Sequence, residues 1–420
     1  MSDPAALARR YGTPAYLYDL AQVRAAHAQL SAALPRPSTL HYSLKANPHP
    51  ELVRQLAELG CHAEVSSTGE LDTAVLAGVP APDILHTGPG KTPAELRHAL
   101  SLGVRRFSVE SAAQLRLLDE IAGQSQVRVS CLLRVNAGRG AGGKLRMGGV
   151  SQFGIELDQL LAEPDAFRGT DFAVVNGLHL FPVSGVDDPA ALLETFAISA
   201  RAARQVAEAG FELAEVDLGG GFATPYLRPG DPVDYRVLRG ELESLLDAEL
   251  PGWREQRPRI SFESGRYLVG SCGTYVCAVT DVKANGERTF VVLDGGINHL
   301  GGLSGIGRML PTRAAAEILT SRAESSPKVP VDLVGPLCTP ADVLARNLEL
   351  PEVRAGDLIA IRNAGAYGLS ASLLGFLSHP APVELVLDGG TVRSASAIAT
   401  VRTEVHAAQD RAGAMSGDPN

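Results

Sequence analysis

The sequence lacks the features that mark membrane, secreted and nucleic-acid-binding proteins. No apolar run approaches the roughly 18 residues that a transmembrane helix needs. Residues 1–11 contain no basic segment followed by an apolar one, as a signal peptide would. The 38 Lys and Arg residues are outnumbered by 47 Asp and Glu residues, for a net charge of −9, whereas nucleic-acid binders normally present a basic face. We therefore expect a cytoplasmic protein with no membrane or nucleic-acid partner.

Cysteine and aromatic residues are also scarce. The sequence contains no Cys-x-x-Cys motif, and no cluster of histidines lies near its five cysteines, so no metal site is predicted. Scattered cysteines in an odd number are typical of free thiols in a reducing compartment. Aromatic residues make up 5% of the chain and hydrophobic residues 45%, so the core must consist mainly of Ala, Leu and Val.

Strand-like and helical patterns alternate along the first two thirds of the chain. Eight apolar strand-like runs begin near residues 38, 61, 83, 105, 127, 174, 213 and 259. The helical patterns between them are Glu51–Leu59, Thr68–Ala77, Pro93–Leu102, Ala112–Ala122, Asp188–Glu208 and Pro232–Glu249. Strands that alternate with helices in this way predict a parallel (β/α)8 barrel, which we assign to residues 20–270.

The pattern changes after about residue 270. Val276–Lys283 and Thr289–Leu293 flank Asn285-Gly286, which predicts a hairpin. Further strand-like runs are Val331–Val334, Leu358–Arg362, Val383–Leu387 and Val392–Ser394. We predict a mostly β domain made of residues 1–19, which include the strand-like Thr13–Tyr18, and residues 271–406. The polar residues 407–420 predict a disordered tail.

Side chains able to do chemistry follow the predicted strands. Lys45 ends the first strand, and Glu263 ends the eighth, where apolar neighbours predict a buried carboxylate that needs a partner. Gly219–Gly221 after the seventh strand and Arg266 after the eighth predict a phosphate site, because barrels commonly bind phosphate there. Taken alone, Lys45 could be a surface lysine and the glycines a tight loop. Together, a lysine and a carboxylate that face a phosphate site suit pyridoxal 5'-phosphate (PLP).

Several separate motifs resemble those of the fold-type III PLP-dependent decarboxylases, which include diaminopimelate, ornithine and arginine decarboxylases. The resemblance runs from about Tyr11 to Pro382 and implies an alanine-racemase-like barrel with a β domain. It rests on Tyr42-Ser43-Leu44-Lys45-Ala46-Asn47, Glu64–Leu71, Asp217-Leu218-Gly219-Gly220-Gly221-Phe222, Glu263-Ser264-Gly265-Arg266-Tyr267, Gly335-Pro336-Leu337-Cys338 and Gly365-Ala366-Tyr367.

The resemblance implies a role for each matching residue. Lys45 would bind PLP covalently, Glu263 would pair with its pyridine nitrogen, and Phe181 would cover its ring. Cys338 would reach the partner's active site as the proton donor, which implies a head-to-tail homodimer with shared active sites. The residues implied to hold the phosphate are Ser184, Gly220, Gly221, Gly265, Arg266 and Tyr367.

Two segments near the implied cofactor site depart from the family pattern. Phe181-Pro182-Val183-Ser184 stands where the family usually has His-x-Gly-Ser, so Phe181 replaces the stacking histidine, although an aromatic face can still cover the ring. His179 lies two residues earlier, on the same face of the strand. It could lie behind the cofactor, but a satisfied buried histidine is the simpler interpretation. Ser264 replaces the usual proline of the Glu-Pro-Gly-Arg motif.

The third departure bears on the substrate. Thr339 follows Cys338, where diaminopimelate and ornithine decarboxylases carry an acidic residue for the distal ammonium. The pattern is similar to that of the carrier-protein-linked glutamyl decarboxylases of aminoglycoside biosynthesis. In diaminopimelate decarboxylases an arginine soon follows the Asp-Gly-Gly segment. Here the first arginine after Asp294-Gly295-Gly296 is Arg308. Thr339, Asp342 and Arg308 are therefore the candidate substrate-binding residues.

We predict PLP-dependent α-decarboxylation of an amino acid, or of a conjugated or carrier-linked aminoacyl group, in specialised metabolism. Diaminopimelate decarboxylase of lysine biosynthesis is the first alternative. A racemase is disfavoured because Glu263 would make the cofactor a stronger electron sink. A PLP-binding regulatory protein without catalysis would need neither Glu263 nor Cys338.

Overall fold

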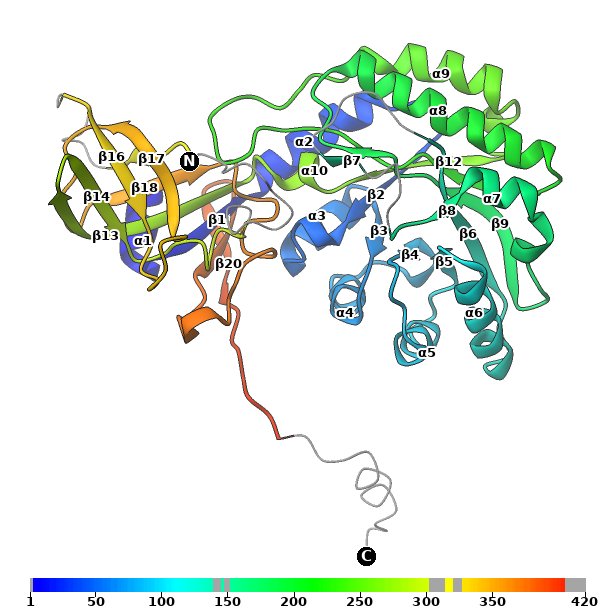
Figure 1. The fold of residues 1–420 in the computed structure, drawn as a ribbon, viewed down its shortest axis with the longest axis horizontal. Coiled ribbons are helices and arrows are strands. Elements are labelled where there is room, and N and C mark those ends of the chain that lie inside the picture. Colours follow the sequence, from blue (N-terminus) through cyan, green and yellow to red (C-terminus); the bar gives the residue numbers. More distant parts are fainter. Residues whose placement is uncertain (1–2, 139–144, 147–151, 302–313, 320–326, 405–420) are drawn as a thin grey trace, which may run out of the picture.

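The computed structural model describes residues 3–138, 145–146, 152–301, 314–319 and 327–404. Figure 1 shows two parts side by side: a barrel surrounded by helices and a second part made mainly of strands, from which residues 398–404 lead away. None of the described helices is long and apolar enough to cross a membrane.

Eight parallel strands form a closed barrel, as the sequence predicted. Their order is β5-β4-β3-β2-β12-β11-β9-β6, and β6 pairs again with β5. The pairing of β2 with β12 joins the first strand of the barrel in sequence to the last. The strands are β2 (Thr39–Ser43), β3 (His62–Val65), β4 (Ile84–His86), β5 (Arg106–Val109), β6 (Val129–Asn136), β9 (Ala173–His179), β11 (Glu215–Asp217) and β12 (Arg259–Ser264).

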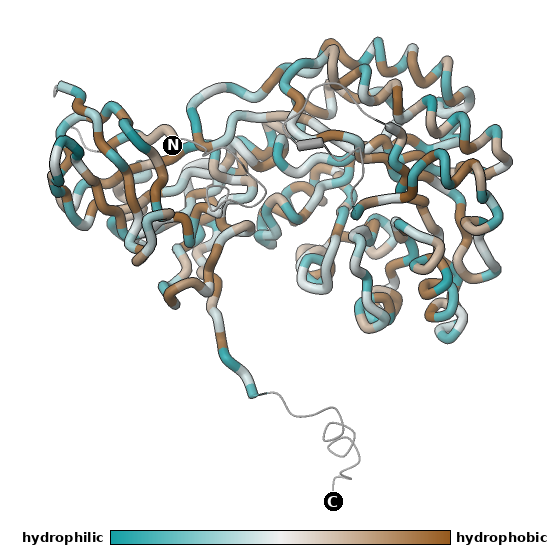
Figure 2. The backbone as a smooth tube through the Cα atoms, in the orientation of Figure 1, coloured by the Kyte–Doolittle hydropathy of each residue, from teal (hydrophilic) through white to brown (hydrophobic). Residues whose placement is uncertain are grey.

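Helices lie outside the barrel strands and alternate with them (Figure 1). Proline at the first turn begins α3, α5 and α8, and Thr92 forms a capping box with Glu95 at α5. Hydrophobic and hydrophilic positions alternate along these helices (Figure 2). The helices are α2 (Leu20–Ala33), α3 (Pro50–Glu58), α4 (Thr68–Leu76), α5 (Pro93–Ser101), α6 (Ala112–Gln124), α7 (Leu157–Ala162), α8 (Pro189–Glu208), α9 (Leu238–Glu249) and α10 (Arg266–Val269).

A second sheet contains strands from both ends of the chain. Its main order is β17-β16-β14-β13-β1-β19-β20, and β18 pairs with β13 and β15. β13 and β14 pair antiparallel around Asn285-Gly286, as predicted, with a positive φ at Gly286. The strands are β1 (Ala15–Asp19), β13 (Gly273–Asn285), β14 (Arg288–Leu293), β15 (Glu317–Ile318), β16 (Val329–Val334), β17 (Val343–Leu350), β18 (Leu358–Arg362), β19 (Val383–Asp388) and β20 (Thr391–Ala397).

The structure contains elements that the sequence patterns did not predict. Helix α1 (Pro4–Tyr11) begins at the Asp3 cap and is only eight residues long, with Ala5 and Ala8 buried. Strand β17 was missed because its buried and exposed residues do not alternate: Leu344 and Ala345 are buried and the next two residues are exposed. The short strand β8 (Ile155–Glu156) pairs with β6, and the short strands β7 (Leu145–Arg146) and β10 (Val183–Ser184) pair with each other in a separate two-stranded sheet. The predicted tail at 407–420 lies outside the described residues.

Three hydrogen bonds fasten the second part of the chain to the segment that carries Lys45. The backbone N–H of Tyr367 donates to the carbonyl of Ala46 at 2.8 Å, and the hydroxyl of Ser370 donates to the same carbonyl at 3.0 Å. The side-chain amide of Asn47 donates to the carbonyl of Gly365 at 2.8 Å. The loop after β2 therefore depends on both parts for its position.

Two leucines of α4 provide a matched test of barrel packing. Leu71 is fully buried at 0% exposure, whereas Leu76 is 71% exposed. Leu71→Ala leaves a cavity and should lower the free energy of unfolding by about 2–5 kcal/mol. Leu76→Ala should change it by no more than about 0.5 kcal/mol. Denaturant unfolding of both variants measures the difference, and equal effects would contradict this packing of α4.

Candidate active site

Lys45 and Glu64 form an ion pair where β2 and β3 end. Lys45 lies in the short 3-10 turn Leu44–Ala46 directly after β2, and its Nζ is 3.4 Å from Oε2 of Glu64. The Glu64 side chain is 3% exposed. Its Oε1 accepts hydrogen bonds from Thr87 at 2.5 Å and from Ser66 at 3.3 Å. These donors come from the ends of β3 and β4, so neighbouring strands together hold one carboxylate.

The two charges of this pair stabilise each other. Burial acts to raise the pKa of Glu64, but the Lys45 ammonium and the Thr87 hydrogen bond outweigh it and lower the pKa to about 2. Burial likewise acts to lower the pKa of Lys45, and the Glu64 and Glu263 carboxylates raise it above its ordinary value. Without a cofactor, Lys45 is therefore a protonated amine at neutral pH.

Glu263 has a partner inside the barrel. Its side chain is 1% exposed, and its Oε1 is 3.2 Å from Nε2 of His179. The other ring nitrogen of His179, Nδ1, is 2.8 Å from the hydroxyl of Ser108. A chain of polar contacts thus crosses from β5 through β9 to β12. His179 is buried, as expected, but it is not fully satisfied: among the described residues its Nε2 makes no hydrogen bond, although Glu263 lies at ion-pair distance.

Phe181 faces Lys45. The Nζ of Lys45 lies 5.3 Å from the centroid of the Phe181 ring. A Cβ added at Gly219 would come within 3.0 Å of the same ring, so the glycine loop after β11 packs closely beside it. Ser184 lies in β10, half-buried, three residues further along the chain.

The glycines after β11 and β12 leave no room for side chains. A Cβ at Gly220 would overlap the carbonyl of Glu263, and one at Gly265 would lie 2.7 Å from Cβ of Ala46. Within the described part of the chain, the backbone N–H groups of Gly220 and Gly221 donate to no other residue. Two buried, unpartnered N–H groups on a bare backbone are the features of an anion cradle.

Arg266 lies beside this cradle between two tyrosine rings. Its guanidinium carbon is 4.6 Å from the ring centroid of Tyr367 and 5.3 Å from that of Tyr226. Because Tyr367 is also fastened to Ala46, the structure brings Arg266 and Tyr367 together near the Lys45 segment. Stacked rings restrict a guanidinium while its N–H groups stay able to bind an anion.

The predicted proton donor and substrate residues lie apart from this group. Cys338 is exposed in the loop between β16 and β17, and Thr339 follows it, half-buried. Asp342 is 3% exposed. Its carboxylate accepts hydrogen bonds from the backbone N–H groups of Ile297 and Leu337. Arg308 lies outside the described residues.

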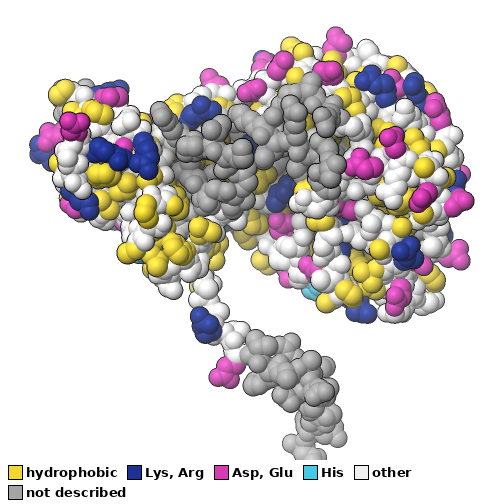
Figure 3. All heavy atoms as spheres, viewed as in Figure 1, with side chains coloured by type: hydrophobic (Ala, Val, Ile, Leu, Met, Phe, Trp, Pro, Cys, Tyr) yellow, Lys and Arg dark blue, Asp and Glu magenta, His cyan; other side chains and the backbone are white. Residues whose placement is uncertain are grey.

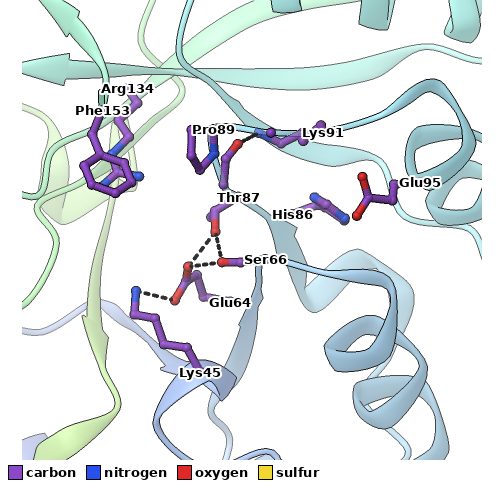
Figure 4. A pocket seen from close by; sticks show the side chains of 12 residues that line it. Lys45, Glu64, Ser66, His86, Thr87, Pro89, Lys91, Glu95, Arg134 and Phe153 are labelled. Carbon is purple, nitrogen blue, oxygen red and sulfur yellow. Dashed lines mark hydrogen bonds and ion pairs between the residues drawn. The ribbon is translucent and has the colours of Figure 1, made fainter. Parts of the chain in front are cut away.

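A cavity of about 330 Å³ extends from Lys45 and Glu64 across the ends of β3, β4 and β6 (Figure 4). Lys91, which was not among the predicted site residues, lines this cavity and donates to the carbonyl of Gly88 at 2.5 Å. Burial lowers the pKa of Lys91 to about 8. Its signal was available, because Thr87–Lys91 directly follows a predicted strand on the face of the barrel where chemistry is expected.

These features define a class of enzyme. A lysine amine, a buried carboxylate on the adjacent strand and a cradle of backbone N–H groups that donate to none of the described residues fit the aldehyde, pyridine nitrogen and phosphate of PLP respectively. The fold and the site are those of a PLP enzyme built on an alanine-racemase-like barrel.

The chain belongs to the pyridoxal-dependent decarboxylase family, whose pyridoxal-binding domain model matches residues 20–270. It is 32% identical to an acyl-carrier-protein L-glutamyl decarboxylase of Niallia circulans, over 92% of this chain and 91% of that protein. It is also 32% identical to a diaminopimelate decarboxylase of Methanothermobacter thermautotrophicus, over 93% and 90%. The structure of Helicobacter pylori diaminopimelate decarboxylase with L-lysine superposes with a TM-score of 0.79 at 28% identity, covering 91% and 93%. The predicted family, fold and cofactor are thereby confirmed.

The ion pair of Glu64 makes stability depend on pH. The pKa of Glu64 is about 2 in the folded chain and about 4.3 when unfolded. Glu64 therefore stabilises the fold above about pH 4.3, and this contribution is lost as the pH falls towards 2. In cofactor-free protein, the difference in unfolding free energy between wild type and Glu64→Gln should be largest above pH 5 and shrink on acidification. Glu58→Gln, on the exposed side of α3, is the control; a difference independent of pH would contradict the ion pair.

Proposed function

We propose that this decarboxylase acts on the α-carboxylate of an amino acid whose distal end carries no free ammonium. A glutamyl group in amide, ester or carrier-linked form is the substrate class that we favour. The observation that carries the proposal is Thr339, a neutral residue directly after Cys338. The Niallia circulans relative, whose name specifies a carrier-protein-linked L-glutamyl group, supports it.

Each residue of the site has a proposed part in the reaction. Bound PLP supplies an electron sink for the carbanion left when CO₂ departs. Lys45 would hold the cofactor covalently through its amine. Glu263 keeps a proton on the pyridine nitrogen, and His179 orients Glu263. Phe181 covers the ring, while the phosphate is held by Ser184, Gly220, Gly221, Gly265, Arg266 and Tyr367.

Cys338 is proposed to end the reaction from the neighbouring chain. Its thiol gives a proton to Cα and is then reprotonated from water. In a single chain the loop of Cys338 does not line the cavity beside Lys45. A homodimer in which the barrel of one chain meets the β domain of the other, 271–406 with 1–19, would complete the site. Leu373, Phe376 and Leu377 in the second part are 42–48% exposed, and Figure 3 displays hydrophobic side chains gathered on that part.

Mixed dimers test the shared site. Lys45→Ala and Cys338→Ala chains should each be inactive. After subunit exchange they should recover about a quarter of wild-type activity, because half of the dimers are mixed and each has one complete site. Exchange is followed with differently tagged chains. Verified exchange without recovery would show that each chain completes its own site.

Substrate choice is tested by kcat/KM for diaminopimelate, ornithine, glutamate and carrier-linked glutamate. The two substrates with a distal ammonium lack a charged hydrogen bond of about 1.5–3 kcal/mol, which corresponds to a loss of roughly ten- to a hundredfold. Thr339→Asp supplies the missing counter-charge and should raise kcat/KM for them, whereas Thr339→Asn, the neutral control, should not. Efficient wild-type turnover of diaminopimelate would favour diaminopimelate decarboxylase instead. That alternative has support because several relatives carry that name.

A further inference from the structure

Asp342 is a buried carboxylate whose partners are backbone groups of two loops. Its Oδ1 accepts a hydrogen bond from the N–H of Ile297 at 2.9 Å, and its Oδ2 accepts one from the N–H of Leu337 at 2.8 Å. Ile297 lies in the loop after β14, and Leu337 lies next to Cys338 in the loop after β16. One side chain therefore connects the Cys338 loop to a second loop of the same sheet.

The backbone of Asp342 closes the same loop. Its carbonyl accepts from the N–H of Gly335 at 3.2 Å, and its N–H donates to the carbonyl of Thr339 at 3.2 Å. Residues 335–342 thus form a loop that is closed by hydrogen bonds to Asp342. Cys338 lies on the exposed side of this loop. A free loop of this length would leave the thiol with many positions, and these contacts restrict it.

The surroundings of Asp342 accept only a side chain of its size. A Cβ at Gly296 or Gly335 would overlap the carboxylate oxygens. Two glycines therefore let the backbones of both loops approach Asp342, and a longer Glu side chain would not fit. Among the described residues, no Lys, Arg or His lies within ion-pair distance of Asp342, so backbone N–H groups are its stabilising partners.

We propose that Asp342 is a positioning residue for Cys338. By holding the Leu337 N–H, it fixes the direction from which the thiol enters the partner's active site, and so decides which carbon receives the proton. This inference rests on the proposed role of Cys338. It also gives Asp342 a task other than contact with the substrate, which leaves Thr339 as the residue of this loop that faces the distal group.

The test compares Asp342→Ala and Asp342→Asn with Asp357→Asn in the PLP-bound enzyme. Asp357 is the matched control: it is buried, lies in the same sheet and accepts the backbone N–H of Arg354 at 2.8 Å. Asparagine keeps one acceptor oxygen at position 342, so its effects should lie between those of wild type and alanine. If Asp342→Ala fails to fold, Asp342→Asn still provides the measurement.

Thiol reactivity measures the position of Cys338 directly. The other four cysteines are buried, so a disulfide reagent such as 5,5'-dithiobis(2-nitrobenzoate) reads Cys338 in the native protein. A loosened loop should raise its labelling rate severalfold in Asp342→Ala. The second readout is the product ratio: a misdirected proton yields the carbonyl compound and the aminated cofactor instead of the amine and regenerated PLP. That fraction should rise about tenfold, as expected when one charge-assisted hydrogen bond of roughly 1.4 kcal/mol or more is lost.

The outcomes separate the two ideas. Changes in labelling rate and product ratio in the Asp342 variants, absent from Asp357→Asn, support the proposal. A lower melting temperature with labelling and products like those of Asp357→Asn would overturn it, because Asp342 would then only stabilise the sheet. If Cys338→Ala keeps normal turnover and products, the role of Cys338 is wrong, while the labelling rate still decides whether Asp342 positions the loop.

Discussion

The pairing of β2 with β12 is the constraint on which the site depends. It closes the barrel between its first and last strands and sets Glu263 beside His41 in register. Lys45, four residues after His41, then emerges at the same end of the barrel as the glycine after β12. That glycine allows the approach, because a Cβ at Gly265 would meet Ala46. A lysine and a carboxylate 218 residues apart in sequence become neighbours through one strand pair.

The barrel interior can hold these charges only because each has partners. Glu64 has Lys45, Thr87 and Ser66, and an unpaired buried carboxylate would instead become protonated. Glu263 has His179 at ion-pair distance from its Oε1, but this oxygen accepts no hydrogen bond from the described residues. Satisfying most, but not all, of the polar atoms makes the site rigid while it remains able to bind. The backbone N–H groups of Gly220 and Gly221 donate to none of the described residues and so are likewise able to bind a ligand.

The sequence was sufficient to predict the barrel and to place Lys45, Glu263 and the glycines after β11 at the ends of its strands. Strands buried on both faces read as continuous apolar runs, and residues just after them had to lie at one end. It was insufficient wherever a side chain meets a distant segment. That His179 touches Glu263 depends on the order of β9, β11 and β12. That Asp342 turns towards Ile297 depends on a loop 45 residues away. The eight residues of α1 were too few for a clear period, and the buried residues of β17 do not alternate with exposed ones.

The arrangement separates the chemistry from the choice of substrate. Residues that would hold PLP lie on barrel strands and are fixed by pairing and packing, so they can serve any amino acid. Cys338 and Thr339 lie on a loop that is held by a hydrogen bond to Asp342 rather than by the barrel. Two glycines allow the backbone to approach that carboxylate closely. Because that loop is fastened at its base, a change at position 339 would alter the charge beside the thiol without moving it, which is what the proposed role of Thr339 requires. Relatives with one fold and different named substrates are what such a division would produce.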